Sequence, residues 1–370
     1  MSLPVLTPWS AGTIADRARR IADRARRVAE LVSTPLLPAD YLDLFSPLRK
    51  AADLRGRVLA VHVETSDAVT LVIRPGRGWR GHRPGQYVRI GVDVDGVRNW
   101  RAYSLTSPTA TTDGCITVTV KAIPDGKVSQ YLVREITPGT IVMLDQAAGD
   151  FTLPPQTPAK VLFLTAGSGI TPVMGMLRNA IDAMGDIIVL HSAPSAADVI
   201  FGAELRALAD RGRIRLIEQH THTAGMVSPE QVAALVPDWA QRQTWACGPS
   251  GLLDAAEKHW SAQGIAHQLH TERFRPTVLA TGEWGTATFA KSGVSVESDG
   301  STPLLQAGEE AGVLMPSGCR MGICFGCVVP LREGSVRDLR NGEITIAAPP
   351  DTVLIQTCVS AAAGACDIDL

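Results

Sequence analysis

The chain has 370 residues with 35 lysines and arginines against 37 aspartates and glutamates, so its formal net charge of -2 excludes a general attraction to nucleic acid. Hydrophobic residues make up 45% of the chain, enough for more than one domain core. The chain has no run of about 18 apolar residues and no secretory leader pattern. We therefore expect a cytoplasmic protein with no transmembrane segment and no nucleic-acid partner.

Residues 1–50 are predicted to form a basic helical arm. The sequence IADRARR at residues 14–20 is repeated letter for letter at 21–27, which predicts an amphipathic helix with arginines on one side. Two interpretations remain open. The helix packs an aliphatic stripe on the body of the protein, or it docks on an acidic partner or an anionic membrane surface and so holds the chain at the membrane periphery.

Residues 51–155 are predicted to form an antiparallel β-barrel. The expected strands cover residues 57–63, 68–73, 86–94, 100–104 and 115–121. Asp95 and Gly96 between two of these strands are a strong hairpin turn signal, because both positions tolerate positive φ. Short strands joined by such turns favour a small barrel.

A candidate flavin site lies at the end of the fourth strand. Arg101, Tyr103 and Ser104 form an R-x-Y-S pattern, in which arginine can bind a phosphate, tyrosine can lie along an isoalloxazine ring and serine can hydrogen-bond its N5 edge. A glycine turn into a later helix start offers backbone N–H groups to a pyrophosphate. The candidate residues there are Lys121, Gly126, Lys127, Val128 and Ser129. Taken singly, Tyr103 also fits an ordinary core aromatic residue and Lys121 a solvated strand residue.

Residues 156–275 are predicted to form a doubly wound α/β domain. Short apolar segments at 161–165, 187–190, 214–218 and 244–247 alternate with helical segments such as 171–184 and 203–210. Buried strands that alternate with helices indicate a parallel sheet covered on both faces.

A candidate nicotinamide site lies at the carboxyl ends of these strands, where ligands of such sheets bind. The sequence T-A-G-S-G-I-T-P at 165–172 follows a strand and opens a helix; we expect Thr171 to cap that helix and Pro172 to occupy its first position. The strand at 244–247 ends in C-G-P, which alone would indicate only a turn with a buried cysteine. The candidate residues are Gly167, Ser168, Gly169, Thr171, Pro172, Ser192, Cys247, Gly248 and Pro249.

The choice of nicotinamide depends on the second strand. It ends at His191 and Ser192 with no acidic residue to hold a free ribose diol, and Ser192, Ser195 and Arg206 are candidates for a 2′-phosphate. NADPH is therefore the expected donor, with NADH as the alternative.

Residues 284–370 are predicted to form an α+β domain with a metal-binding loop. Strands are expected at 286–289 and 294–298 and a helix at 303–311. The loop contains a C-x4-C-x2-C run with a fourth cysteine further on, the plant-type spacing for a four-thiolate [2Fe-2S] cluster. Its metal ligands are Cys319, Cys324, Cys327 and Cys358. Structural zinc is the alternative, although zinc sites usually present two paired cysteines.

The order of these motifs resembles the ferredoxin-NADP reductase superfamily fused to a C-terminal plant-type ferredoxin domain, over about residues 50–370. The resemblance implies a β-grasp fold for the last domain, FAD at Arg101, Tyr103 and Ser104, and a nicotinamide flanked by Thr171 and Cys247. Glu272 and Phe274 resemble the E-x-F end of the family, whose aromatic ring covers the flavin until nicotinamide displaces it. The implied catalytic residues are Ser104, Cys247, Glu272 and Phe274.

The long basic arm and the stretch at 85–96 further resemble reductases that serve membrane-bound di-iron fatty-acyl desaturases and alkane hydroxylases. The expected route runs from NADPH to FAD, to the cluster and to an external electron-accepting metalloprotein, which can be membrane-bound. A soluble Rieske-type oxygenase is the alternative acceptor. A non-catalytic iron-sulfur redox sensor is the alternative from another class.

Overall fold

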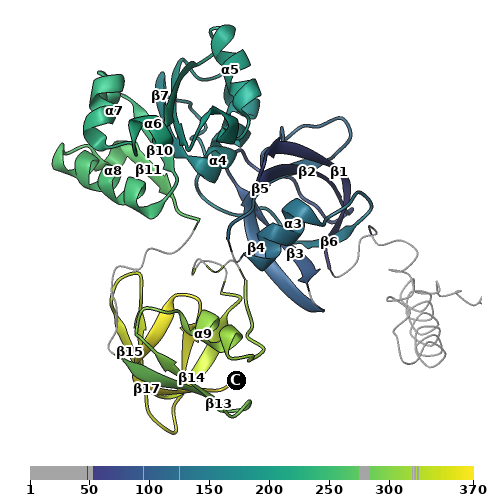
Figure 1. Cartoon of the computed structure of the whole chain (residues 1–370), viewed down its shortest axis with the longest axis vertical. Coiled ribbons are helices and arrows are strands. Elements are labelled where there is room, and N and C mark those ends of the chain that lie inside the picture. Colours follow the sequence, from purple (N-terminus) through teal and green to yellow (C-terminus); the bar gives the residue numbers. More distant parts are fainter. Residues whose placement is uncertain are drawn as a thin grey trace, which may run out of the picture.

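The computed structural model describes Leu48 and residues 53–94, 96–124, 126–274, 284–318, 320, 322 and 325–370. The helix expected in the N-terminal arm lies outside the described residues, as do Cys319 and Cys324. Within the described part of the chain, no helix has the length and apolar character needed to cross a membrane. The described residues fold into three units, each built on its own sheet (Figure 1).

The first unit is an antiparallel β-barrel. Its elements are β1 (Arg55–Thr65), β2 (Ala68–Pro75), β3 (Tyr87–Val94), β4 (Val97–Ser104), β5 (Ile116–Lys121), α3 (Lys127–Arg134) and β6 (Ile141–Leu144). The strands follow the order β4-β3-β6-β1-β2-β5, and a bridge between Leu105 and Val118 joins the two ends of this order. Alternate aliphatic side chains fill the interior, because successive strand residues point to opposite faces.

The second unit is a five-stranded parallel sheet in the order β11-β10-β7-β8-β9. Its strands are β7 (Lys160–Ala166), β8 (Asp186–Ala193), β9 (Arg215–His220), β10 (Gln243–Cys247) and β11 (Leu269–Glu272). Its helices are α4 (Ile170–Ala180), α5 (Gly202–Asp210), α6 (Thr221–Ala224), α7 (Pro229–Leu235) and α8 (Ser250–Ala262). One core lies between the sheet and the pair α4 and α5, and another between the sheet and the pair α7 and α8.

Helix α4 packs against the barrel. A Cβ atom on Gly175 would overlap the carbonyl oxygen of Leu105, so the two backbones meet at a position where only glycine fits. Arg178 donates a hydrogen bond to the carbonyl oxygen of Thr106 at 2.8 Å, and Asn179 donates one to that of Ser107 at 3.1 Å. These contacts place the end of β4 beside the parallel sheet.

The third unit combines a mixed sheet with one helix. Its elements are β12 (Gly285–Phe289), β13 (Val294–Ser298), α9 (Leu304–Glu310), β14 (Val328–Asp338), β15 (Ile344–Ala347), β16 (Val353–Gln356) and β17 (Ser360–Ile368). The order is β13-β12-β17-β14-β15, with β16 also paired to β14, and β12 runs parallel to β17. Leu304 and Leu305 of α9 are buried in the same core as Phe289.

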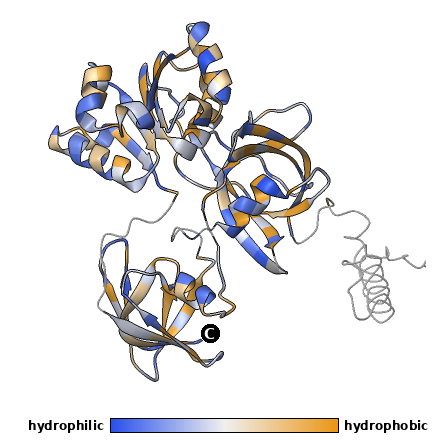
Figure 2. Cartoon of the chain, viewed as in Figure 1, coloured by the Kyte–Doolittle hydropathy of each residue, from blue (hydrophilic) through white to orange (hydrophobic). Residues whose placement is uncertain are grey.

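The hydropathy of each residue follows this arrangement. In Figure 2 the barrel strands are mostly hydrophobic, whereas the helices of the second unit alternate between hydrophobic and hydrophilic residues. Strands inside the sheets are buried on their core faces, and α5, α7 and α8 bury only some of their residues, whereas α4 is buried over its first eight residues. The expected fold class, an antiparallel barrel, a parallel α/β sheet and an α+β ferredoxin-like unit, is confirmed.

Candidate functional site

Strand β4 presents the R-x-Y-S residues at the edge of the barrel. Burial raises the pKa of Tyr103. Burial, together with the nearby positive charge of Arg320, lowers the pKa of Arg101 to about 10. The hydroxyl oxygen of Ser104 is buried and has no hydrogen-bond partner among the described residues. A buried hydroxyl without a partner is costly, so this position fits a group that forms a hydrogen bond with a bound ligand.

The glycine turn before α3 is held by its own side chains. The Ser129 hydroxyl accepts a hydrogen bond from the Ile123 backbone N–H at 3.2 Å and donates one to the Gly126 carbonyl at 3.0 Å. The helix begins at Lys127, and Val128 points into the barrel core. Ser129 therefore shapes the turn whose backbone was expected to meet a pyrophosphate.

Lys121, at the end of β5, forms an ion pair within the barrel. Its ammonium group contacts both carboxylate oxygens of Asp67 at 2.6 and 2.5 Å, an ion pair that connects β5 to the turn after β1. This local pair accounts for Lys121, and its predicted contact with the cofactor stays a prediction.

The loop after β7 differs from the expected cap. Residues Gly167–Gly169 form a single 3-10 turn that leads directly into α4 with Gly169 at the N-cap position. Thr171 therefore lies inside the helix, where its hydroxyl donates to the Ser168 carbonyl at 2.9 Å, and Pro172 is the third helical residue rather than the first. The expectation that Thr171 caps the helix is wrong, because the preceding turn already carries the chain into helical geometry.

Two glycines of this loop have different roles. Gly167 has a φ of 55°, and a Cβ atom there would meet nothing within 4 Å, so its backbone is open to a ligand. A Cβ on Gly169 would overlap the carbonyl oxygen of Cys247, so this glycine brings the two loops together. Gly248 packs closely on Ala166, and Pro249 precedes the first residue of α8.

The strand register places four side chains in a row along the carboxyl edge of the sheet. Glu272 pairs with Cys247, Cys247 with Thr165, and Thr165 with His191. Thr165 Oγ1 and His191 Nδ1 lie 2.8 Å apart, while His191 Nε2 is buried without a partner among the described residues. Burial lowers the pKa of His191 to about 4, so this imidazole is neutral at pH 7.

The other end of the row is also neutral. Burial raises the pKa of the Cys247 thiol well above its usual range and that of Glu272 to about 8. Glu272 Oε2 is buried and has no partner in the described structure. A neutral thiol beside a protonated carboxyl group can contact an uncharged dihydronicotinamide ring without stranding a charge. Phe274, just after β11, packs against the core under α4.

Two of the residues expected to recognise a 2′-phosphate already form contacts within the protein. Arg206 forms an ion pair with Glu218 at 2.8 Å, and Ser195 donates a hydrogen bond to Asp198 at 2.6 Å. Ser192 is buried near the end of β8. The choice between NADPH and NADH therefore stays a prediction.

Two of the four predicted metal ligands belong to the described residues. Cys327 and Cys358 are buried in the core of the third unit, and the guanidinium of Arg340 lies within electrostatic range of both thiols. Arg340 also donates to the Gly322 carbonyl at 3.1 Å, which fixes the loop between the ligands. Buried sulfur donors beside a positive charge fit an anionic thiolate cluster. Cys115 and Cys366 are buried cysteines outside the predicted ligand set.

Sequence reasoning did not select His191 or Arg320. Both stand next to selected residues, but their role depends on contacts across strands or between units that spacing does not reveal. A weak signal for His191 existed, because it ends a buried strand at the edge where ligands bind.

Domain models match all three units. An oxidoreductase FAD-binding domain matches residues 77–153, an oxidoreductase NAD-binding domain matches 163–258, and a 2Fe-2S iron-sulfur cluster binding domain matches 287–363. These matches confirm FAD, NAD(P)H and a [2Fe-2S] cluster as the cofactors and favour the cluster over zinc.

Similar proteins share this organisation. The chain is 52% identical to an NADPH oxidoreductase of Mycobacterium tuberculosis over 92% of this chain and 90% of that protein. It is 32% identical to the ferredoxin reductase component of a 3-ketosteroid-9-alpha-monooxygenase of Mycobacterium tuberculosis, over 75% of this chain and 82% of the relative. It is 27% identical to the glycine betaine monooxygenase reductase subunit of Chromohalobacter salexigens, over 75% and 84% of the two chains.

The fold is likewise that of a solved reductase. Phthalate dioxygenase reductase aligns with a TM-score of 0.60 and 19% identity, over 86% of this chain and 98% of that one. The chain therefore belongs to the ferredoxin-NADP reductase superfamily, among the oxidoreductases whose FAD-binding and NAD-binding domains are combined with a C-terminal [2Fe-2S] ferredoxin domain.

Proposed function

We propose that the chain oxidises NADPH and delivers electrons one at a time, by way of FAD and its [2Fe-2S] cluster, to an external metalloprotein that activates O2. The observation that carries this proposal is a set of buried polar atoms that have no partner among the described residues, at the end of β4 and at the carboxyl edge of the parallel sheet. Ser104 Oγ and Glu272 Oε2 both belong to this set. Such atoms are expected where a ligand completes the hydrogen bonds.

Each residue of the site has a defined task. Arg101 would neutralise a phosphate, Ser104 would donate to the ring edge that accepts hydride, and Tyr103 would contact the ring. Cys247 and Glu272 would hold the dihydronicotinamide from the sheet side, and Phe274 would occupy its place until it binds. When bound, FAD supplies the conversion of one hydride into two single electrons, which a nicotinamide cannot provide alone. Cys319, Cys324, Cys327 and Cys358 would hold the one-electron centre.

The acceptor we favour is a membrane-bound di-iron fatty-acyl desaturase or hydroxylase. The repeated basic sequence in the first 35 residues supports this choice, because such a segment is attracted to anionic membrane surfaces. A soluble oxygenase is the second candidate, since relatives at 27% and 32% identity are reductase components of monooxygenases. Deletion of residues 1–35 separates them: we expect slower turnover with a membrane-bound acceptor, and unchanged turnover would favour the soluble one.

The electron route is tested by a pair of cysteine variants. Cys358→Ser removes one predicted ligand, whereas Cys366→Ser changes a buried cysteine of the same core that is not one. We expect Cys358→Ser to reduce ferricyanide at the parental rate with NADPH but to lose most cytochrome c reduction, and Cys366→Ser to keep both. Equal cytochrome c reduction by parent and Cys358→Ser would contradict the route. No steady NADPH oxidation with either acceptor would instead favour a redox sensor.

A further inference from the structure

The third unit brings charged residues to the flavin site of the barrel. Arg320, from the loop that contains the cysteines, and Glu309, from α9, both lie within electrostatic range of Arg101 on β4. Figure 1 shows α9 on the side of the third unit that faces the barrel. Arg101 therefore lies where the two units approach one another.

Two guanidinium groups from different units approach each other here. Arg101 is half-buried, and its one recorded hydrogen bond goes to the Trp100 carbonyl oxygen at 2.8 Å. In the described structure no carboxylate forms an ion pair with Arg101. Like charges in a partly desolvated place repel one another. Glu309 offsets this repulsion only in part, because its effect on Arg101 is smaller than that of Arg320.

Arg320 has donors left for such an anion. Its terminal nitrogen forms an ion pair with Glu309, which orients the guanidinium group, but its Nε is buried and has no partner among the described residues. Glu309 does not bridge the two arginines, because it pairs with Arg320 and not with Arg101. The unsatisfied donor and the repulsion between the two cations are both removed by one group: a phosphate between them.

We propose that Arg320 is a second ligand of the FAD pyrophosphate beside Arg101, so that FAD binding holds the ferredoxin unit against the flavin barrel. This inference rests on the proposed role of Arg101 and goes beyond it, because it makes cofactor occupancy a condition for docking of the unit that carries the electrons onward. The adenine dinucleotide form of flavin is then required for transfer between units as well as for anchoring.

The first test measures FAD affinity of the full chain by quenching of flavin fluorescence. Arg320→Ala is expected to raise the FAD dissociation constant about tenfold, the size of one lost charge-assisted hydrogen bond, and Arg320→Lys to raise it less. Arg332→Ala removes an exposed arginine of the same unit and is the charge-matched control, with an unchanged constant. At saturating FAD, cytochrome c reduction should still be slower for Arg320→Ala than for Arg332→Ala.

The outcomes distinguish the two proposals. If Arg101→Ala leaves FAD affinity unchanged, the proposed pyrophosphate site is wrong. If Arg101→Ala weakens FAD but Arg320→Ala behaves like Arg332→Ala, the role of Arg320 alone is overturned.

A second test needs no substitution and so does not depend on how the variants fold. Small-angle scattering of the wild-type chain freed of flavin should show a smaller radius of gyration after FAD is added, but not after riboflavin, which lacks the pyrophosphate. The same compaction with both flavins, or none with FAD, would overturn the inference.

Discussion

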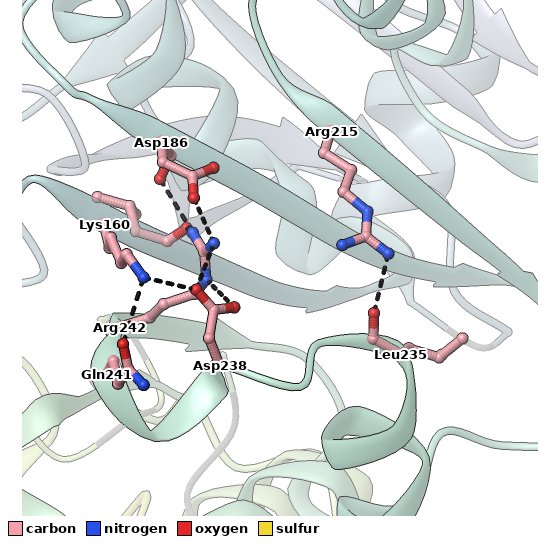
Figure 3. Close-up of polar contacts among 8 residues, drawn as sticks. Lys160, Asp186, Arg215, Leu235, Asp238, Gln241 and Arg242 are labelled. Atoms are coloured by element: carbon pink, nitrogen blue, oxygen red, sulfur yellow. Dashed lines mark hydrogen bonds and ion pairs between the residues drawn. The ribbon is translucent and has the colours of Figure 1, made fainter.

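The two edges of the parallel sheet differ in how their polar side chains are paired. At the carboxyl edge, His191 Nε2 and Glu272 Oε2 are buried and have no partner in the described part of the chain. At the amino edge, Arg242 lies just before β10 and binds Asp186 at the start of β8 and Asp238 in the preceding turn (Figure 3). Lys160, the first residue of β7, contacts Asp238 at 2.9 Å.

This difference in pairing indicates that the amino edge contributes to stability and the carboxyl edge to function. The amino-edge network pairs its charges with one another and so connects the ends of β7, β8 and β10. Hydrogen bonds and ion pairs with Arg242 and Lys160 lower the pKa of Asp238 to about 2. Substitutions at the amino edge should therefore change unfolding, and substitutions at the ligand-facing edge should change chemistry.

The largest effect is expected at the amino edge. Arg242→Met would leave Asp186 and Asp238 without their shared partner, and the side chain it removes is only 4% exposed. Breaking a buried ion pair costs about 3–5 kcal/mol, and because both carboxylates are partly exposed we expect about 3 kcal/mol, read from urea unfolding. NADPH-dependent ferricyanide reduction at low temperature should be unchanged.

Arg215→Met is the control for that prediction. Arg215 is the first residue of β9 at the outer side of the sheet, is exposed, and donates one hydrogen bond to the Leu235 carbonyl at 3.1 Å (Figure 3). Its loss should change the free energy of unfolding by about 0.5 kcal/mol or less. Equal losses for the two variants would mean that the network around Arg242 contributes nothing beyond an ordinary surface arginine.

At the ligand-facing side, Ser104→Ala should slow chemistry without loss of stability. The Ser104 hydroxyl has no partner in the described structure, so its removal costs little in folding, whereas loss of a donor to the flavin ring edge should slow flavin reduction about 100-fold. Stopped-flow absorbance with NADPH measures the rate. Ser107→Ala removes another buried, unpartnered hydroxyl a short distance along the chain and should react at the parental rate; similar slowing in both variants would argue against a specific role for Ser104.

The sequence predicts the strands of the sheets better than it predicts the side-chain contacts between strands that are distant in sequence. The expected strand at 244–247 is β10 (Gln243–Cys247), because a short apolar run bounded by turn residues indicates a buried strand. The network around Arg242 was not predicted, since its members are distant in sequence and only the parallel pairing of β7 with β8 and β10 brings them together.

In the candidate site, too, the sequence pattern identifies residues but not which of them are neighbours. Cys247 and Glu272 were selected separately, and strand register makes them neighbours. Thr171 was assigned to the wrong helical position because a 3-10 turn precedes α4, which no local pattern of the T-A-G-S-G-I-T-P segment indicates. The roles of these residues in binding stay predictions.

The last effect in this comparison concerns pH. The pKa of Glu272 rises from 4.5 to about 8 in the folded chain because burial disfavours the charged form. As pH rises above 4.5 the unfolded chain loses this proton first, so the contribution of Glu272 to stability falls between about pH 4.5 and pH 8 and then levels off. Glu272→Gln cannot titrate and should lack this decline. Urea unfolding at several pH values measures the difference, and parallel curves for the two proteins would show that Glu272 is ionised in the folded chain at neutral pH, which would remove the neutral pair proposed to hold the nicotinamide.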